Sequence, residues 1–188
     1  MRAVFVLCAT AACASAGNDV SDSGTGGGSD ASALKDAAPS IDAPASQCPS
    51  SDTCAAAMML GTVSGDSTTP KLTASGYRAA WYRVRVTEDN SSIGGLKLRV
   101  AAKLTSPAAV DFDVLVYVNA GSDVIECATT TGTTTTSGNL DTVKAEWGEG
   151  TISNGSDDGR NVSIEVRPKS GQCMPAYAWQ LEVEGNWL

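Results

Sequence analysis

Apolar and polar residues alternate along residues 110–118, which read VDFDVLVYV. Phe112, Val114 and Val116 fall on one side of a two-residue repeat, together with the valines at both ends. Successive side chains of a strand point to opposite faces of a sheet, so the segment is predicted to be a strand with a fully apolar inner face. We take this strand as the centre of the fold.

Seven further segments repeat this alternation, with turn-forming residues between them. They are residues 60–65, 80–87, 96–104, 124–129, 142–147, 162–166 and 176–184. Apart from the short run 55–60, none shows the 3.6-residue apolar period of a helix. Regular spacing and one-sided alternation predict an all-β domain over residues 48–188, an antiparallel β-sandwich of about eight strands.

The first residues of the chain read as an export signal, residues 1–16. Met-Arg is followed by a short apolar run, which is below the roughly 20 apolar residues that cross a bilayer. Two processing sites compete. The first resembles a bacterial lipobox and would lead to lipidation of Cys13, although Thr10 stands where an aliphatic residue is usual. The second is cleavage after Ala16. We expect lipidation at Cys13, because the segment that comes next suits a tether.

That segment, residues 17–47, consists mostly of Ala, Ser, Gly, Asp and Pro. It has too little apolar surface to offset the entropy lost on ordering, so it is predicted to be a disordered linker. The expected location is therefore outside the cytoplasm: lipid-anchored in a bacterial cell envelope, or secreted.

Charge and composition exclude several classes of function. The net charge is −8, which argues against nucleic acid and against a direct contact with anionic membrane, leaving a lipid anchor as the only membrane attachment. The chain has no histidine, so triads and metal sites built on histidine are ruled out.

Four cysteines lie in the predicted domain, and an exported chain is expected to pair them. Spacing alone allows three pairings. We favour Cys48–Cys54, which closes a small loop, and Cys127–Cys173. A four-cysteine zinc site is the alternative, but it lacks a C-x2-C pair and is disfavoured by export.

The strands DFDVLVYV, WYRVRV, SIEVRP and YAWQLEVEG resemble those of the bacterial pre-peptidase C-terminal domain. Asp111, Phe112, Asp113, Val114, Val116 and Tyr117 match the central strand of that family. The resemblance covers about residues 59–185 and implies a jelly-roll-like sandwich without catalytic activity, appended to secreted proteins. This chain carries no protease domain beside the module, and no residue match transfers calcium or collagen binding.

Two sets of acidic residues are candidate sites. Asp111 and Asp113 share one face of their strand, about 6.5–7 Å apart, within reach of an inverting glycosidase pair. Asp157 and Asp158, with Asn154, could hold calcium in a glycine-flanked loop, although the spacing is not that of an EF-hand. Solvated carboxylates are the simpler interpretation of both, and no other cofactor is expected.

A candidate ligand patch lies on outward positions of two predicted strands. Trp81, Arg83 and Arg85 share one face of residues 80–87, and Leu115 and Tyr117 share the outer face of the central strand. If the strands are neighbours, this aromatic and basic surface suits a carbohydrate or a protein. The alternative is that a terminal segment or the loop at the first cysteines covers it.

Together these observations favour a non-catalytic, surface-anchored or secreted β-sandwich that serves as a binding or accessory module. A purely structural envelope lipoprotein is the second hypothesis, and a secreted hydrolase using carboxylates is the third.

Overall fold

The computed structural model describes residues 48, 52–89, 97–134, 138–148 and 156–187. The chain divides into two units, Met1–Ala37 and Ala38–Leu188, and every described residue belongs to the second. The predicted export signal, the lipidation site Cys13 and the predicted linker lie outside the described residues. No helix among the described residues is long and apolar enough to span a membrane.

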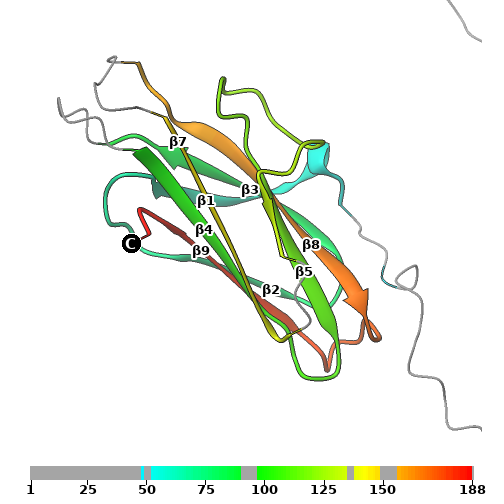
Figure 1. Ribbon diagram of the computed structural model, residues 1–188. Coiled ribbons are helices and arrows are strands. Elements are labelled where there is room, and N and C mark those ends of the chain that lie inside the picture. Colours follow the sequence, from blue (N-terminus) through cyan, green and yellow to red (C-terminus); the bar gives the residue numbers. More distant parts are fainter. Residues whose placement is uncertain (1–47, 49–51, 90–96, 135–137, 149–155, 188) are drawn as a thin grey trace, which may run out of the picture. The chain divides into compact units, whose positions relative to one another are not determined.

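The described residues form an all-β sandwich. One sheet, called sheet A, has the order β1-β3-β8-β5-β6, and the other, sheet B, has the order β2-β9-β4-β7. In Figure 1, β8 (orange) runs between β3 and β5, and β9 (red) runs between β2 and β4. The strands are β1 (Met58–Ser64), β2 (Leu72–Gly76), β3 (Ala80–Thr87), β4 (Lys97–Thr105), β5 (Asp111–Tyr117), β6 (Gly132–Thr133), β7 (Leu140–Gly148), β8 (Arg160–Ser170) and β9 (Trp179–Gly185).

The core of the sandwich consists largely of the side chains that the alternation predicts to point inward. Phe112, Val114 and Val116 of β5 are buried against the inner face of sheet B. Trp179 of β9 links the two layers, since its ring meets Tyr82 and Phe112 edge-on, with ring centroids 6.1 and 6.5 Å apart. Aromatic rings prefer this arrangement to a direct face-to-face stack, and it fills the space between the sheets.

Two strand predictions are corrected. Residues 124–129 do not form a strand, because the Glu126 carboxylate accepts hydrogen bonds from the backbone N–H groups of residues 127, 128 and 129 and holds them in a turn. β1 and β3 pair in parallel, whereas the other paired strands are antiparallel. The parallel pair arises because the chain crosses to sheet B as β2 before returning as β3.

The strand β2 was not predicted. Its inward positions are Leu72, Ala74 and Gly76, so it carries little of the apolar signal of a strand. Gly76 is required by packing, since a Cβ there would lie 2.6 Å from the Trp179 ring. A small residue thus lets the edge strand approach the largest side chain of the core.

The disulfides differ from the predicted pairs Cys48–Cys54 and Cys127–Cys173. Cys48 pairs with Cys173, and Cys54 pairs with Cys127. Cys54 lies in a 3-10 turn, η2 (Cys54–Ala56), which begins after the capping residue Thr53 and packs against β3. This turn directs Cys54 to the loop 118–131 instead of to Cys48. All four cysteines are oxidised, so the zinc alternative is wrong.

Candidate functional site

The outer face of sheet B carries a groove across β2, β9 and β4. Its volume is about 380 Å³. The polar side chains that line it are Thr73, Ser75, Lys103, Thr105, Gln180 and Glu182. The register of the three strands brings these side chains together. Ser75, Gln180 and Thr105 form one row across the strands, and Thr73, Glu182 and Lys103 form the next. At about 4.8 Å between strands, the rows are about 10 Å long.

Ion pairs occupy much of this face. Lys71 Nζ lies 2.7 Å from a Glu182 oxygen and 3.0 Å from a Glu184 oxygen, and Lys97 Nζ lies 2.7 Å from a Glu146 oxygen. The hydrogen bond from Lys71, with the charges of Lys71 and Lys103, holds the pKa of Glu182 below its usual value. Lys103 itself is exposed and makes no ion pair within 4.0 Å among the described residues.

Trp187 closes one end of the face. The Lys144 ammonium lies 4.0 Å from its ring centroid and the Arg99 guanidinium 5.7 Å from it, so two cations pack on one aromatic ring. Ala101 points outward between Glu184 and Lys144 and is nevertheless buried. The open groove therefore begins beyond Ala101, at Lys103.

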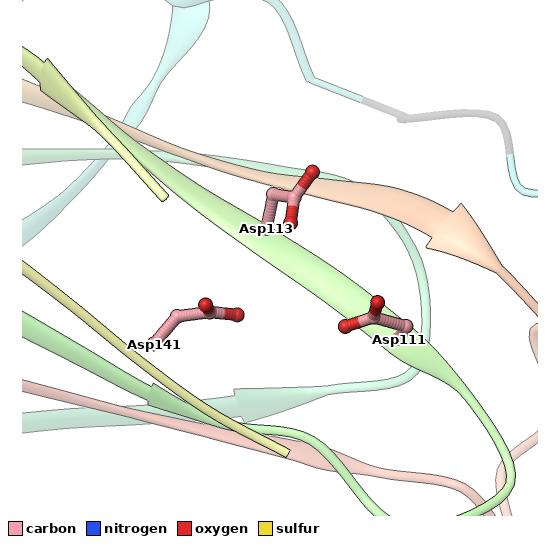
Figure 2. Close-up of side chains that lie close together, drawn as sticks. All are labelled: Asp111, Asp113 and Asp141. Atoms are coloured by element: carbon pink, nitrogen blue, oxygen red, sulfur yellow. The ribbon is translucent and has the colours of Figure 1, made fainter. Parts of the chain in front are cut away.

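A second cluster lies at the edge of the sandwich and joins three carboxylates. Asp111 and Asp113 come from β5, and Asp141 comes from β7 of the other sheet. Figure 2 shows the Asp141 carboxylate reaching toward the two carboxylates on β5. One oxygen from each lies within 4.8 Å of the others, and Lys169 Nζ lies 3.5 Å from both Asp111 and Asp113.

This cluster confirms that Asp111 and Asp113 lie together, and it adds Asp141. Three carboxylates can supply oxygen ligands to a divalent cation, but Lys169 already contributes a positive charge there. Burial raises the pKa of Asp113, the charge of Lys169 opposes this, and the charges of Asp111 and Asp141 add to it. Asp141 is 1% exposed at a core-facing position of β7, in phase with Val143. In the sequence, Asp141 could have been recognised as a polar residue at a position that the alternation assigns to the core.

Replacing Asp113 with Asn should remove one contribution to the pH dependence of stability, the one that favours the folded state at low pH. An unfolded aspartate titrates near pH ~3.9, below the raised pKa of folded Asp113. Between those two values the folded state holds a proton that the unfolded state has lost, so the free energy of unfolding falls as pH rises through that window and is level above it. Asp113→Asn removes this slope and should raise stability at pH 7 by ~0.5 kcal/mol, measured by urea unfolding across pH.

The control is Glu146→Gln, because the hydrogen bond from Lys97 and the Lys97 charge hold the pKa of Glu146 below its usual value. A lowered pKa makes a carboxylate contribute stability that is lost as pH falls, so this variant should change the pH slope in the opposite direction. An unchanged slope in Asp113→Asn would show that the cluster does not penalise the ionised carboxylate.

The loop predicted to bind calcium is only partly described, since Asn154 lies outside the described residues. Asp157 Oδ1 accepts a hydrogen bond from the Gly159 backbone N–H at 2.7 Å, and Asp158 Oδ1 accepts one from Arg160 at 3.1 Å. The Arg160 side chain is mostly buried and pairs with Asp158. Calcium binding at this loop stays a prediction, and an ion there would compete with the Arg160 charge.

The predicted ligand patch does gather on one face of sheet A, but it is not an open surface. Arg83, Leu115 and Tyr117 are buried, while Trp81 and Arg85 are half-buried. The alternative, a covered patch, is the better description. The covering elements are η2, whose Cys54 carbonyl accepts a hydrogen bond from Arg83 at 2.6 Å, and the loop 118–131, whose Asp123 pairs with Arg85 at 2.6 Å.

The aromatic residues of this patch serve packing. Trp81 and Tyr117 pack with ring centroids 5.2 Å apart, and the Tyr117 hydroxyl donates a hydrogen bond to Glu165 at 2.6 Å. Burial, together with this hydrogen bond and the charge of Glu165, raises the pKa of Tyr117 to about 12. Tyr117 is therefore a neutral donor in this network and offers no proton near neutral pH.

The chain was compared with known proteins by sequence and by structure. No family profile and no curated protein matches the chain. Among solved structures, the pre-peptidase C-terminal domain of a collagenase from Bacillus anthracis is similar, with a TM-score of 0.38 and 9% sequence identity over 68% of this chain and 94% of that chain. A similarity of this degree adds nothing to the strand order described above.

Proposed function

We propose that this chain is an exported, non-catalytic binding module, and that the groove on the outer face of sheet B is its binding surface. The observation that carries the proposal is the groove itself, a hollow of about 380 Å³ lined by hydroxyl, amide and charged side chains on an open sheet face. Ligand sites are usually concave, and a few polar groups in them fix the orientation of the ligand. The covered patch on sheet A offers no comparable surface.

The groove is suited to binding and not to hydrolysis. Glycoside hydrolysis uses two carboxyl groups on either side of the scissile bond. Within the part of the chain that the structure describes, the groove has one carboxylate, Glu182, and Lys71 holds it in an ion pair. The three-carboxylate cluster is at the edge of the sandwich, on β5 and β7, and none of its residues lines the groove.

Export is supported by the two disulfides, which are typical of domains that fold outside the cytoplasm. The predicted export signal and the predicted Ala/Ser/Gly/Asp linker agree with this, and lipidation at Cys13 would attach the module to an envelope. The groove would then face a surface polymer or a secreted partner while the linker spans the distance.

The test is retention of the full chain on insoluble polysaccharides. Cross-linked polygalacturonate, chitin and cellulose serve as probes. Ser75→Trp fills the groove from an exposed position of an edge strand, where a tryptophan is well tolerated. We expect the wild type to be retained on at least one polymer and Ser75→Trp to pass through with an unchanged melting temperature.

The matched control is Val124→Trp, which places the same side chain on the exposed loop 118–131, away from the groove. It should bind as the wild type does. Equal retention of Ser75→Trp and wild type would show that the groove is not the binding surface. No retention of the wild type on any polymer would favour the purely structural envelope component.

A further inference from the structure

The outer face of sheet B carries more cations than acids, although the protein as a whole is acidic. Register and ion pairs place five cations on it, Lys71, Lys97, Arg99, Lys103 and Lys144, against three acids, Glu146, Glu182 and Glu184. The whole chain has 13 basic and 21 acidic residues. The face thus has a net charge of +2 in a chain whose net charge is −8. An anionic ligand is attracted to this face and repelled by the rest of the chain.

Lys103 is the cation available to such a ligand. It stands between Glu182 of β9 and Thr142 of β7, and its exposed side chain lines the groove. The other four cations are engaged: Lys71 and Lys97 with glutamates, and Arg99 and Lys144 with the Trp187 ring. A carboxylate entering the groove would receive a charge-assisted hydrogen bond from Lys103 without displacing an ion pair.

The remaining lining of the groove favours a sugar. Thr73, Ser75 and Thr105 offer hydroxyls that both donate and accept, and Gln180 offers an amide that does the same. Sugar hydroxyls need such partners, whereas a polyphosphate has none to donate. Among the described residues, no aromatic or large exposed apolar side chain lines the groove, so this lining lacks the anchor that a protein partner uses.

We propose that the groove binds a carboxylate-bearing polysaccharide, with Lys103 on the uronate carboxylate and the hydroxyl and amide side chains on the sugar hydroxyls. This inference rests on the proposed function and names the ligand class of the same site. The described lining offers a neutral sugar no aromatic ring to stack on. The charge of Lys103 therefore supplies the affinity and the preference for an acidic sugar over a neutral one.

The experiment is calorimetric titration of the full chain with oligogalacturonate and with the same oligomer as its methyl ester, which keeps the sugar and removes the charge. We expect the acid form to bind at least about tenfold more tightly, from one charge-assisted hydrogen bond. Its affinity should fall as salt rises, because binding a polyanion releases counterions. Lys103→Gln should lose about tenfold in affinity for the acid form and little for the ester.

Lys144→Gln is the matched control, since it removes the same charge from the same face but outside the groove. It should lose less than about threefold, as expected for a distant screened charge. Equal losses in the two variants would overturn the role of Lys103. Inorganic polyphosphate is the third probe, and binding as tight as that of the acid oligomer would show a general anion site and overturn the sugar assignment.

The two proposals fail in different ways. If the methyl ester binds as tightly as the acid, or if Ser75→Trp abolishes retention on a neutral polymer alone, the uronate inference fails and the binding module stands. If neither oligomer binds and the wild type is retained on no polymer, both fail.

Discussion

Val114→Asp is expected to abolish the cooperative folding of the domain. Val114 is fully buried in the core cluster, where β5 pairs with Val166 of β8. The substitution loses roughly 1.5–3 kcal/mol of apolar burial and adds an unpaired carboxylate, which costs several kcal/mol more in the interior. The total stability of a domain is about 5–15 kcal/mol, so the change removes most or all of it.

Circular dichroism with thermal melting measures this effect. The control, Val124→Asp, introduces the same charge at an exposed position of the loop 118–131 and should melt within about 2 °C of the wild type. A Val114→Asp protein with the wild-type melting curve would contradict the register of β5 and the sandwich built on it.

Removing the Cys48–Cys173 disulfide is expected to have the second largest effect. The two cysteines are 125 residues apart, and the other pair, Cys54–Cys127, is 73 apart. A crosslink restricts the unfolded chain more as the loop lengthens, which gives about 4.9 kcal/mol for the first pair and about 4.4 kcal/mol for the second. Replacing each pair with alanines should therefore destabilise the domain in that order.

Guanidinium unfolding of the two double variants measures the difference. Loss of the Cys54–Cys127 bond should also free the loop 118–131 and expose Arg83, which limited proteolysis would detect in that variant only. Non-reducing peptide mapping is the prior check. A peptide joining Cys48 to Cys54 would contradict both pairings, and equal stability of the wild type and the Cys48/Cys173 variant would contradict the entropic argument.

The strands that could be predicted are those with large side chains in one phase. Residues 80–87 were predicted with the bounds that β3 has, and the central strand differs from β5 by one residue at each end. β2 was not predicted because its inward residues Ala74 and Gly76 are small and give little apolar signal. Residues 124–129 looked like a strand because Val124 and Ile125 are β-branched, yet both side chains are exposed and the Glu126 carboxylate organises the turn.

The candidate site was harder to predict for a geometric reason. Alternation separates inner from outer positions, but it does not tell which outer face another segment covers. Trp81 and Tyr117 were on the covered face, whereas Thr73 and Gln180, with no distinctive chemistry, were on the open one. Disulfide pairing failed likewise, because the fold brings Cys54 to within 5.8 Å of Cys127, measured between Cα atoms, across a long stretch of sequence.

Lysine footprinting tests the binding face most directly. The full chain is acetylated with and without saturating oligogalacturonate, and the rate at each lysine is read by mass spectrometry. The proposed groove predicts that Lys103 is protected by the oligomer while Lys169, on β8 at the edge cluster, reacts at an unchanged rate. Bound oligomer with Lys103 acetylated as fast as in the free protein would contradict it.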